Sequence, residues 1–359
     1  MIEKIQELII KETLEKDNKK INEKESLRAY LSSFKNYQLI RLSVIHVWVD
    51  DDFTDLYKIQ NLSKKKKDYI VNYVTENLDV IIKSFIKVLD TDKINVLKKI
   101  INHDGNVKYG FDNFSLSPYF IAFIKNFAFA KVEYNKSKEF VHIFIHEDIV
   151  KIIKDALSDK KIKKYNLKCN DIYKYTMACV DVYGIVTLNK LYSLFIKQVY
   201  EIEDEEFKKT IEVFSLFDER VNIYRYDDEA LITNMEFDNE DYAIDFYIKT
   251  EGIYHNFTKQ DLYNIENEKY LKNLKSYKTL MNYLDRNFEG IKDDVQTINE
   301  LLIMDYINIA QISKEQADKN VMNNLDDFFE ADIIQKNKIR NMLQAIFNEY
   351  PKWIKKGNK

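Results

Sequence analysis

The stretch YTMACVDVYGIVTLNKLYSLF, from Tyr175 to Phe195, is the most sharply patterned part of the chain. Its first half predicts a helix that ends before Gly184, because glycine readily adopts the left-handed backbone with which helices often end. Ile185 and Val186 predict a short extended step, and Thr187 is a good N-cap for a second helix. A helix, a tight turn, a short strand and a second helix begin a helix-turn-helix or winged-helix unit.

The residues after this stretch continue the winged-helix order, with a third helix predicted over Asp204–Phe217 and a hairpin over Val221–Phe237. A similar order occurs upstream. There the patterns predict helices over 78–89, over 92–101 and from about 115 to about 127, then a hairpin over 127–146 and a helix over 147–157. The two segments share an order of elements but no residue-level repeat, so they are weak evidence for duplication.

Glycine and proline are scarce, with six and two among 359 residues. Both residues interrupt helices and form turns, so their scarcity predicts a helix-rich protein with few elaborate loops. The chain has neither GxGxxG nor GxxxxGK[ST], and we expect no nucleotide cofactor. Cys169 and Cys179 form no CxxC motif, which argues against a disulfide scaffold or a zinc ribbon.

Membrane and secretory signals are not evident in the sequence. No apolar run reaches the roughly 18 residues that a membrane span requires. The first residues, MIEKIQELIIKETLEK, carry glutamates throughout and do not resemble a secretory signal. We therefore expect a cytoplasmic protein with no membrane partner.

The expected fold is mainly α with small β-hairpins, in which winged-helix-like modules precede a helical C-terminal domain. The expected domains are an N-terminal helix (1–25), a segment with the first winged-helix-like module (26–160), the second such module (165–255) and the helical domain (256–359). Within the last domain, helices are predicted over 259–266, 268–286, 293–309, 313–324 and 332–350.

Charge is unevenly divided along the chain. Residues 1–165 have 30 basic and 24 acidic side chains, a balance of +6, and residues 166–359 have 25 and 35, a balance of −10. This division suggests that any contact with a polyanion involves the first half. Ordinary variation of surface charge is the alternative.

Lysines supply the candidate nucleic-acid contacts. Lys64, Lys65, Lys66 and Lys67 stand at a predicted helix N-terminus, where the helix dipole disfavours cations unless an anion is near. A phosphate backbone would be one such anion, and the acidic group at Asp50–Asp55 would be another; a solvated surface is the simplest alternative. The first hairpin adds three further lysines near its turn, Lys131, Lys136 and Lys138.

The second module has the opposite charge. Its hairpin turn contains Asp227, Asp228 and Glu229, and its third helix begins with Asp204, Glu205 and Glu206. Carboxylates at the position of a recognition helix would be repelled by a nucleic-acid groove. This module is therefore expected to contact proteins rather than to read DNA.

Several possible catalytic or metal sites have a simpler structural explanation. His142 and His146 alternate along a predicted strand, but a third ligand for a metal is not evident. The Asp50–Asp55 group lacks the spacing of a calcium loop, and Asp112, Glu133 and Lys136 only loosely resemble a nuclease core. Cys179 has no nearby histidine that would activate it. We expect no catalytic residue, no metal and no cofactor.

Two stretches resemble known families. SLRAYLSSFKNYQLIRLSVIHVWVDDDFTDLYKIQNLSKKKKDYIVNYVTENL, residues 26–78, resembles the helical start of Rho N-terminal-like and SAP-like modules. MACVDVYGIVTLNKLYSLF and the C-terminal NMLQAIFNEYPKWIKKGNK resemble uncharacterised proteins of low-GC Gram-positive bacteria, some of which carry a SEC-C tail. Here the SEC-C cysteines are absent, and Lys352 replaces the usual arginine before Trp353. The resemblance covers about a third of the chain and implies nucleic-acid association for its first half.

The expected function is that of a non-enzymatic regulatory or adaptor protein. Its basic first half would contact DNA or RNA, and its acidic second half would contact a protein or associate with itself. Two alternatives remain, a metal-dependent nuclease or toxin-like effector of a mobile element, and a structural homo-oligomer.

Overall fold

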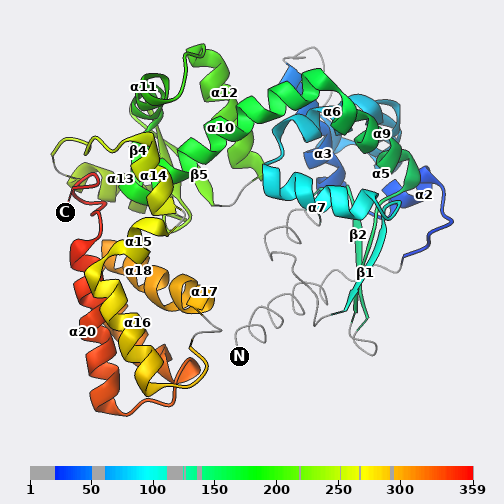
Figure 1. Cartoon of the computed structure of the whole chain (residues 1–359). Coiled ribbons are helices and arrows are strands. Elements are labelled where there is room, and N and C mark those ends of the chain that lie inside the picture. Colours follow the sequence, from blue (N-terminus) through cyan, green and yellow to red (C-terminus); the bar gives the residue numbers. More distant parts are fainter. Residues whose placement is uncertain are drawn as a thin grey trace. The chain divides into compact units, whose positions relative to one another are not determined.

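The computed structural model describes residues 21–50, 61–110, 124, 127–135, 140–217, 220–250, 252–266, 268–291 and 295–358. It is mainly α-helical and has two small three-stranded antiparallel sheets, which confirms the expected fold class (Figure 1). The described elements of the first half of the chain are α2 (Leu27–Ser32), α3 (Asn36–Asp50), the 3-10 turn η1 (Leu62–Lys64), α5 (Lys67–Glu76), α6 (Leu78–Val88), α7 (Thr91–Ile101), β1 (Asn106–Gly110), β2 (Lys131–Asn135), β3 (Phe140–Phe144) and α9 (Glu147–Ser158).

The second half begins with α10 (Lys160–Tyr183), which is longer than the predicted helix over Asp171–Val182. The remaining elements are β4 (Ile185–Thr187), α11 (Leu188–Gln198), α12 (Asp204–Phe217), β5 (Val221–Tyr226), β6 (Glu229–Asn234), α13 (Glu240–Lys249), α14 (Lys259–Glu266), α15 (Lys269–Asn273), α16 (Lys275–Asn287), α17 (Val295–Thr297), the π-helical η3 (Ile298–Met304), α18 (Asp305–Ile312), α19 (Lys314–Asn324), the 3-10 turn η4 (Leu325–Asp327) and α20 (Ile333–Glu349).

The chain divides into two compact units. The N-terminal unit contains residues 2–173 and 209–218, and the C-terminal unit contains residues 174–208 and 219–359. The division falls within α10 and within α12. Each unit contains one of the two sheets.

Amphipathic helices form the core of the N-terminal unit. Helix α6 buries its apolar side chains between α3 and α9, with Ile81, Ile82 and Phe85 fully buried. Tyr30 of α2 is also fully buried, and its hydroxyl donates to the carbonyl oxygens of Phe129 and Phe144, both at 3.1 Å. These two hydrogen bonds join α2 to the sheet of the same unit. They also satisfy the buried hydroxyl, which would destabilise the folded state if it were left unpaired.

The sheet of the N-terminal unit has the strand order β1-β3-β2. The hairpin strands β2 and β3 confirm the predicted hairpin, whereas β1 lies in a segment for which the sequence predicted no strand. Strand β3 pairs with both neighbours over its whole length, so that Phe144 lies opposite Asn106 on one side and opposite Lys131 on the other. The predicted helix from about 115 to about 127 lies mostly outside the described residues.

The sheet of the C-terminal unit has the strand order β4-β6-β5. The predicted helix, turn, short strand and second helix over residues 175–195 are all present. Helix α10 ends at Tyr183, Gly184 has a φ of +72°, and β4 follows directly. The hydroxyl of Thr187 accepts from the backbone N–H of Lys190 at 3.2 Å and so caps α11. The local signals were sufficient here because each acts within one turn of the chain.

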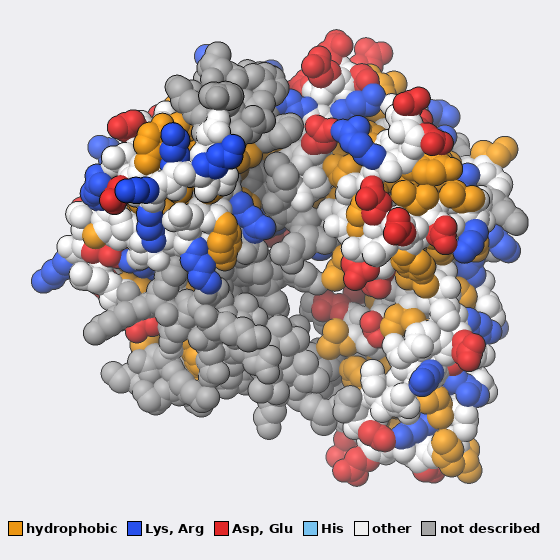
Figure 2. All heavy atoms as spheres, turned by 180° about the vertical axis from the view of Figure 1, so that it is seen from behind, with side chains coloured by type: hydrophobic (Ala, Val, Ile, Leu, Met, Phe, Trp, Pro, Cys, Tyr) orange, Lys and Arg blue, Asp and Glu red, His pale blue; other side chains and the backbone are white. Residues whose placement is uncertain are grey.

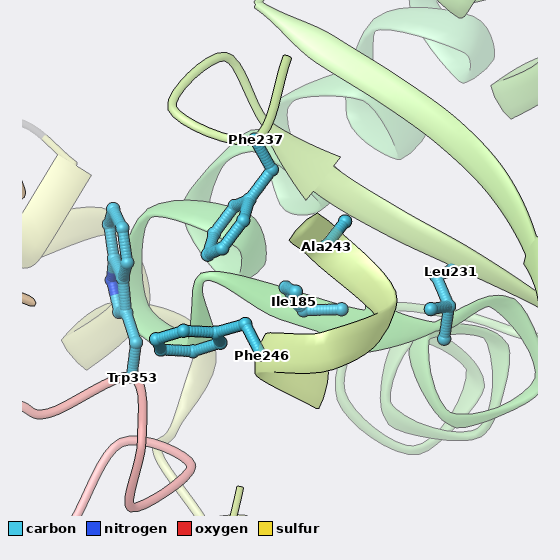
Figure 3. Packing of buried hydrophobic residues seen from close by; sticks show 6 residues of the cluster. All are labelled: Ile185, Leu231, Phe237, Ala243, Phe246 and Trp353. Atoms are coloured by element: carbon cyan, nitrogen blue, oxygen red, sulfur yellow. The ribbon is translucent and has the colours of Figure 1, made fainter. Parts of the chain in front are cut away.

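The C-terminal segment of the chain packs against this second sheet. Trp353 is 1% exposed and lies against Phe237 and Phe246, beside Ile185 of β4 (Figure 3). Its indole N–H donates to the carbonyl oxygen of Asp181 at 2.9 Å. Gln311 of α18 fixes the same segment, because its amide donates to Pro351 O at 2.7 Å and accepts from Trp353 N at 3.0 Å.

The last third of the C-terminal unit is helical, with two differences from the predicted helices. Leu274 has an extended backbone, with ψ of 141°, and divides the predicted helix over 268–286 into α15 and α16. The predicted helix over 293–309 contains the π-helical turns of η3. In η3 the buried Asn299 accepts from the hydroxyl of Tyr277 at 2.8 Å and donates to Glu268 at 2.9 Å, so its amide is satisfied.

Among the residues that the structure describes, no helix is long and apolar enough to cross a membrane.

Candidate nucleic-acid interface

The four lysines from Lys64 to Lys67, here called the lysine segment, join η1 to α5. Lys64, Lys65 and Lys66 are exposed, and Lys67 is half-buried. They follow the fully buried Leu62, which anchors η1 in the unit. An apolar anchor before a run of exposed cations holds the run on the surface of a packed domain.

The N-terminus of α5 makes this segment suitable for an anion. Lys66 is the N-cap residue, and its side chain makes no capping hydrogen bond. The first N–H groups of a helix carry a partial positive charge that capping side chains or anions normally neutralise. Lysines add full positive charges at the same end, so a phosphate group placed there would gain from both.

Two exposed tyrosines accompany the cations of this region. Tyr69 on α5 is 47% exposed, and the Lys65 ammonium lies 5.3 Å from its ring centroid. Tyr37 on α3 is 44% exposed, and the guanidinium of Arg41 lies 5.7 Å from its ring centroid. Sequence reasoning missed these aromatic residues, although Tyr37 and Arg41 lie four positions apart on α3, a spacing at which side chains on a helix meet.

The neighbouring helix α2 contributes Arg28. Its guanidinium donates to the side-chain oxygen of Asn72 at 2.6 Å and lies 3.8 Å from the carboxylate of Asp68. Asp68 is thus the acidic residue next to the lysine segment, and it is already paired with an arginine. Together, Arg28 and the lysine segment outnumber the acidic side chains of α5, Asp68 and Glu76. Blue side chains are also frequent over the N-terminal unit on the face seen at the left of Figure 2.

Lys131 differs from the surface lysine that the sequence led us to expect. Its residue is 2% exposed, and its ammonium forms an ion pair with Glu25 and lies 4.9 Å from the ring centroid of Tyr30. Since a buried and paired ammonium cannot approach a phosphate backbone, Lys131 is not part of the candidate interface. The other two hairpin candidates, Lys136 and Lys138, lie outside the described residues.

The two histidines occupy structural positions in the N-terminal unit. His142 on β3 is buried, and its Nε2 lies 2.7 Å from the side-chain oxygen of Asn106 on β1. Burial lowers the pKa of His142, and the nearby Lys108 lowers it further. His146 lies beyond the end of β3 rather than on the strand, and its Nδ1 accepts from Asp148 N at 3.3 Å as the N-cap of α9. Its Nε2 lies 3.1 Å from Glu25 O.

A polar pocket of about 470 Å³ lies beside these groups. Two of its carboxylates are paired within the unit: Glu25 forms an ion pair with Lys131, and Asp104 forms one with Lys154 at 2.9 Å. Within the described part of the chain, no group of histidine, cysteine and carboxylate side chains could hold a metal ion. Asp112 and the acidic residues at 51, 52 and 55 lie outside that part.

Cys179 is fully buried in α10, and burial raises the pKa of its thiol. Because the thiolate is the nucleophilic form, this environment disfavours nucleophilic chemistry. Cys169 is also buried and reduced.

The acidic candidates of the second module are on the surface. Asp204 and Glu205 at the start of α12 are exposed, as are Asp227 and Asp228 in the β5–β6 turn. Asp204 also pairs with Lys208 at 2.7 Å. These carboxylates lie at a helix N-terminus, where negative charge is favourable, so helix stability alone accounts for those on α12.

Comparison of the chain with family models, with curated proteins and with solved structures found no match.

Proposed function

We propose that the chain is a non-enzymatic regulatory or adaptor protein whose N-terminal unit binds nucleic acid through the lysine segment. The observation that carries this proposal is the run of exposed lysines at the uncapped N-terminus of α5. Phosphates would neutralise both the lysines and the helix terminus. The exposed Tyr69 and Tyr37 supply flat apolar surfaces on which unpaired bases can stack, which favours a single-stranded nucleic acid.

We also propose that the second sheet belongs to a winged-helix module that contacts protein. Its elements run in the order of such a module: the end of α10, then β4, α11, α12 and the β5–β6 hairpin. The carboxylates at the start of α12 and in the hairpin turn would repel a phosphate backbone and would suit a partner with basic side chains.

Fluorescence anisotropy with labelled 20-nucleotide single-stranded DNA, RNA and duplex DNA tests the nucleic-acid proposal. We expect single strands to bind more tightly than duplex, with affinity falling steeply as salt rises. Replacing Lys64, Lys65, Lys66 and Lys67 by glutamate should abolish binding. Replacing Tyr69 by alanine should weaken single-strand binding about fivefold to thirtyfold, as expected for one lost stacking contact of about 1–2 kcal/mol.

The matched control replaces the same four lysines by arginine, which keeps the charge and should keep binding. A second control replaces Lys314 and Lys319 on α19 of the C-terminal unit by glutamate and should leave binding unchanged. Absence of binding at low salt, or equal binding by the glutamate variant, would contradict the proposal. Cleavage of the probe in the presence of Mg²⁺ would favour the nuclease alternative instead.

A further inference from the structure

An apolar groove on the N-terminal unit lies apart from the lysine segment in sequence. It has a volume of about 230 Å³ and lies among α6, α7, α9 and α10. Its lining consists of Ile86, Thr91, Ile94, Asn95, Lys98, Ala156, Leu157, Ile162, Lys163, Asn166 and Leu167. Leu167 is 66% exposed at this groove, so its side chain is accessible to a partner that enters the groove.

Buried amide groups hold the walls of the groove together. The side-chain amide of Asn166 on α10 donates to the carbonyl oxygens of Ile86, Lys87 and Leu89 at 3.0, 3.1 and 2.7 Å. One turn later, Asn170 accepts from Thr91 N at 2.7 Å. These bonds join α10 to the corner between α6 and α7, so the groove has a fixed shape before any partner binds. A preformed site avoids part of the entropic cost of binding.

The volume of the groove indicates what can occupy it. Sites for small molecules and cofactors usually have volumes of about 300–1,000 Å³. A groove of about 230 Å³ is smaller than that range and accommodates one or two large apolar side chains. An anchor side chain inserted into a pocket is the usual energetic centre of a protein–protein contact.

The charged residues in and beside the groove are mainly lysines, which favour an acidic partner. Among its described lining residues, only Lys98 and Lys163 are ionisable. Lys160, Lys161 and Lys164 on the first turns of α10 are exposed, and they outnumber the exposed Asp92 of α7 and Asp155 of α9, which adjoin lining residues of the groove. The nearby Asp159 is occupied as the cap of α10, since its carboxylate accepts from Lys161 N at 2.7 Å.

We propose that this groove binds an acidic segment of a partner protein, which inserts an apolar side chain against Leu167 while its carboxylates face Lys98 and Lys163. Apolar burial would supply affinity, and the lysines would disfavour basic segments through like-charge repulsion. A nucleic acid fits this surface less well, because the floor of the groove is aliphatic and Leu167 offers no flat face for stacking.

The test is a display selection of random 16-residue peptides against the immobilised full-length chain. We expect enriched peptides to carry one or two large apolar residues among aspartates and glutamates. Anisotropy with labelled enriched peptides should then show that Leu167→Asp weakens binding at least tenfold. The double variant Lys98→Glu/Lys163→Glu should weaken it by a similar factor. All three positions are exposed, so these variants should fold normally, which circular dichroism checks.

The matched control is Ile253→Asp, which places the same charge at an 85% exposed apolar residue of the C-terminal unit and should leave peptide binding unchanged. Failure to enrich any peptide, enrichment of basic peptides, or equal binding by the Leu167→Asp variant would overturn the proposal. If the groove variants weakened binding of the 20-nucleotide probes instead, the groove would be a nucleic-acid surface. Replacement of the lysine segment by glutamate should not affect the peptides, so the two proposals can fail separately.

Discussion

The two sheets of the molecule have the same strand order, but different kinds of contact cover them. Both have a central strand that comes last in sequence and pairs with a strand on each side. In both, a glycine with positive φ precedes the first strand: Gly105 at +79° and Gly184 at +72°. The carbonyl oxygen of each glycine accepts from the backbone near the end of the central strand, from Ile145 N at 2.8 Å and from Asn234 N at 3.4 Å. This equivalence strengthens the case for a repeated module beyond element order alone.

Opposite ends of the described chain cover the two sheets. In the N-terminal unit, residues 21–25 contact the sheet through polar groups: Ile21 N donates to Glu133 at 3.2 Å, and Glu25 pairs with Lys131. In the C-terminal unit, Trp353 covers the sheet mainly through apolar packing. The same arrangement of strands is thus covered in one unit by the Glu25–Lys131 ion pair, here called the ionic closure, and in the other by Trp353, here called the apolar closure. The two closures should respond differently to mutation and to pH.

Removal of the apolar closure should have the largest effect. Replacing Trp353 by alanine deletes a fully buried ring and should lower the free energy of unfolding of the C-terminal unit by about 4 kcal/mol. Hydrogen exchange of the β6 amides should report the loss, whereas the β3 amides should exchange at the wild-type rate. Trp353→Phe, which keeps most of the apolar contact, is the control and should cost less. An equal increase in the exchange rates of the β3 and β6 amides would show that the apolar and ionic closures are not independent.

Breaking the ionic closure should destabilise the other sheet. Replacing Lys131 by methionine leaves the nearly buried carboxylate of Glu25 without its cation and should cost about 3 kcal/mol, measured by exchange of the β3 amides. Lys154→Met is the matched control, because Lys154 pairs with Asp104 on the surface, where solvent screens the ion pair, and its loss should have little effect. A similar cost for both variants would mean that burial does not distinguish the two ion pairs.

The glycines test whether the two sheets are equivalent. A Cβ at Gly184 would lie 2.6 Å from the Trp353 ring, and one at Gly105 would lie 2.5 Å from Ile145 O. With the strain of positive φ added, either substitution by alanine should cost about 2–3 kcal/mol. Gly290→Ala is the control, since Gly290 also has positive φ but has open space around it and should cost about 1 kcal/mol.

The Trp353→Ala background separates the two glycines further. There the Gly184→Ala penalty should shrink, because the clashing ring is gone, whereas the Gly105→Ala penalty should persist. Chemical unfolding of the wild type, the three single variants and the two double variants measures both coupling energies. Purely additive costs at Gly184 would contradict the contact with Trp353.

Mild acid should produce the smallest effect, with opposite signs in the two units. Burial lowers the folded pKa of His142 below its ordinary 6.5, so its contribution to stability is complete above pH 6.5 and is lost as pH falls below that value. Burial raises the folded pKa values of Glu236 and Asp305 in the C-terminal unit, so stability there rises as pH falls through those values toward 4.5 and 3.8. Urea unfolding followed by NMR signals of β3 and β6 between about pH 7 and about pH 4 measures both trends. His142→Gln should remove the acid sensitivity that His142 adds to β3, and a common direction in both units would refute the contrast.

Sequence signals were accurate where the determining residues are close together. Gly184 and Thr187 set the end of α10 and the start of α11 within four positions, and the structure confirms both. Strand β1 was missed, because its partner β3 begins 30 residues later and its own five residues have weak alternation. In the candidate interface, Lys64, Lys65 and Lys66 are exposed, as expected for a run of lysines at a helix N-terminus. The burial of Lys131 could not be foreseen, because its partner Glu25 is 106 positions away.

The sequence by itself determined that this protein is helix-rich, that a helix ends in a turn at Gly184 and that cations gather in its first half. Backbone preferences and capping act within a few residues of the chain, and composition does not depend on which residues are in contact, so these properties can be read from the sequence. Only the tertiary structure decided which lysine is exposed and which is buried, which segment covers each sheet, and where an apolar groove lies beside lysines. Burial and pairing depend on residues far apart in the chain, as with Trp353 and its acceptor Asp181, which are 172 positions apart.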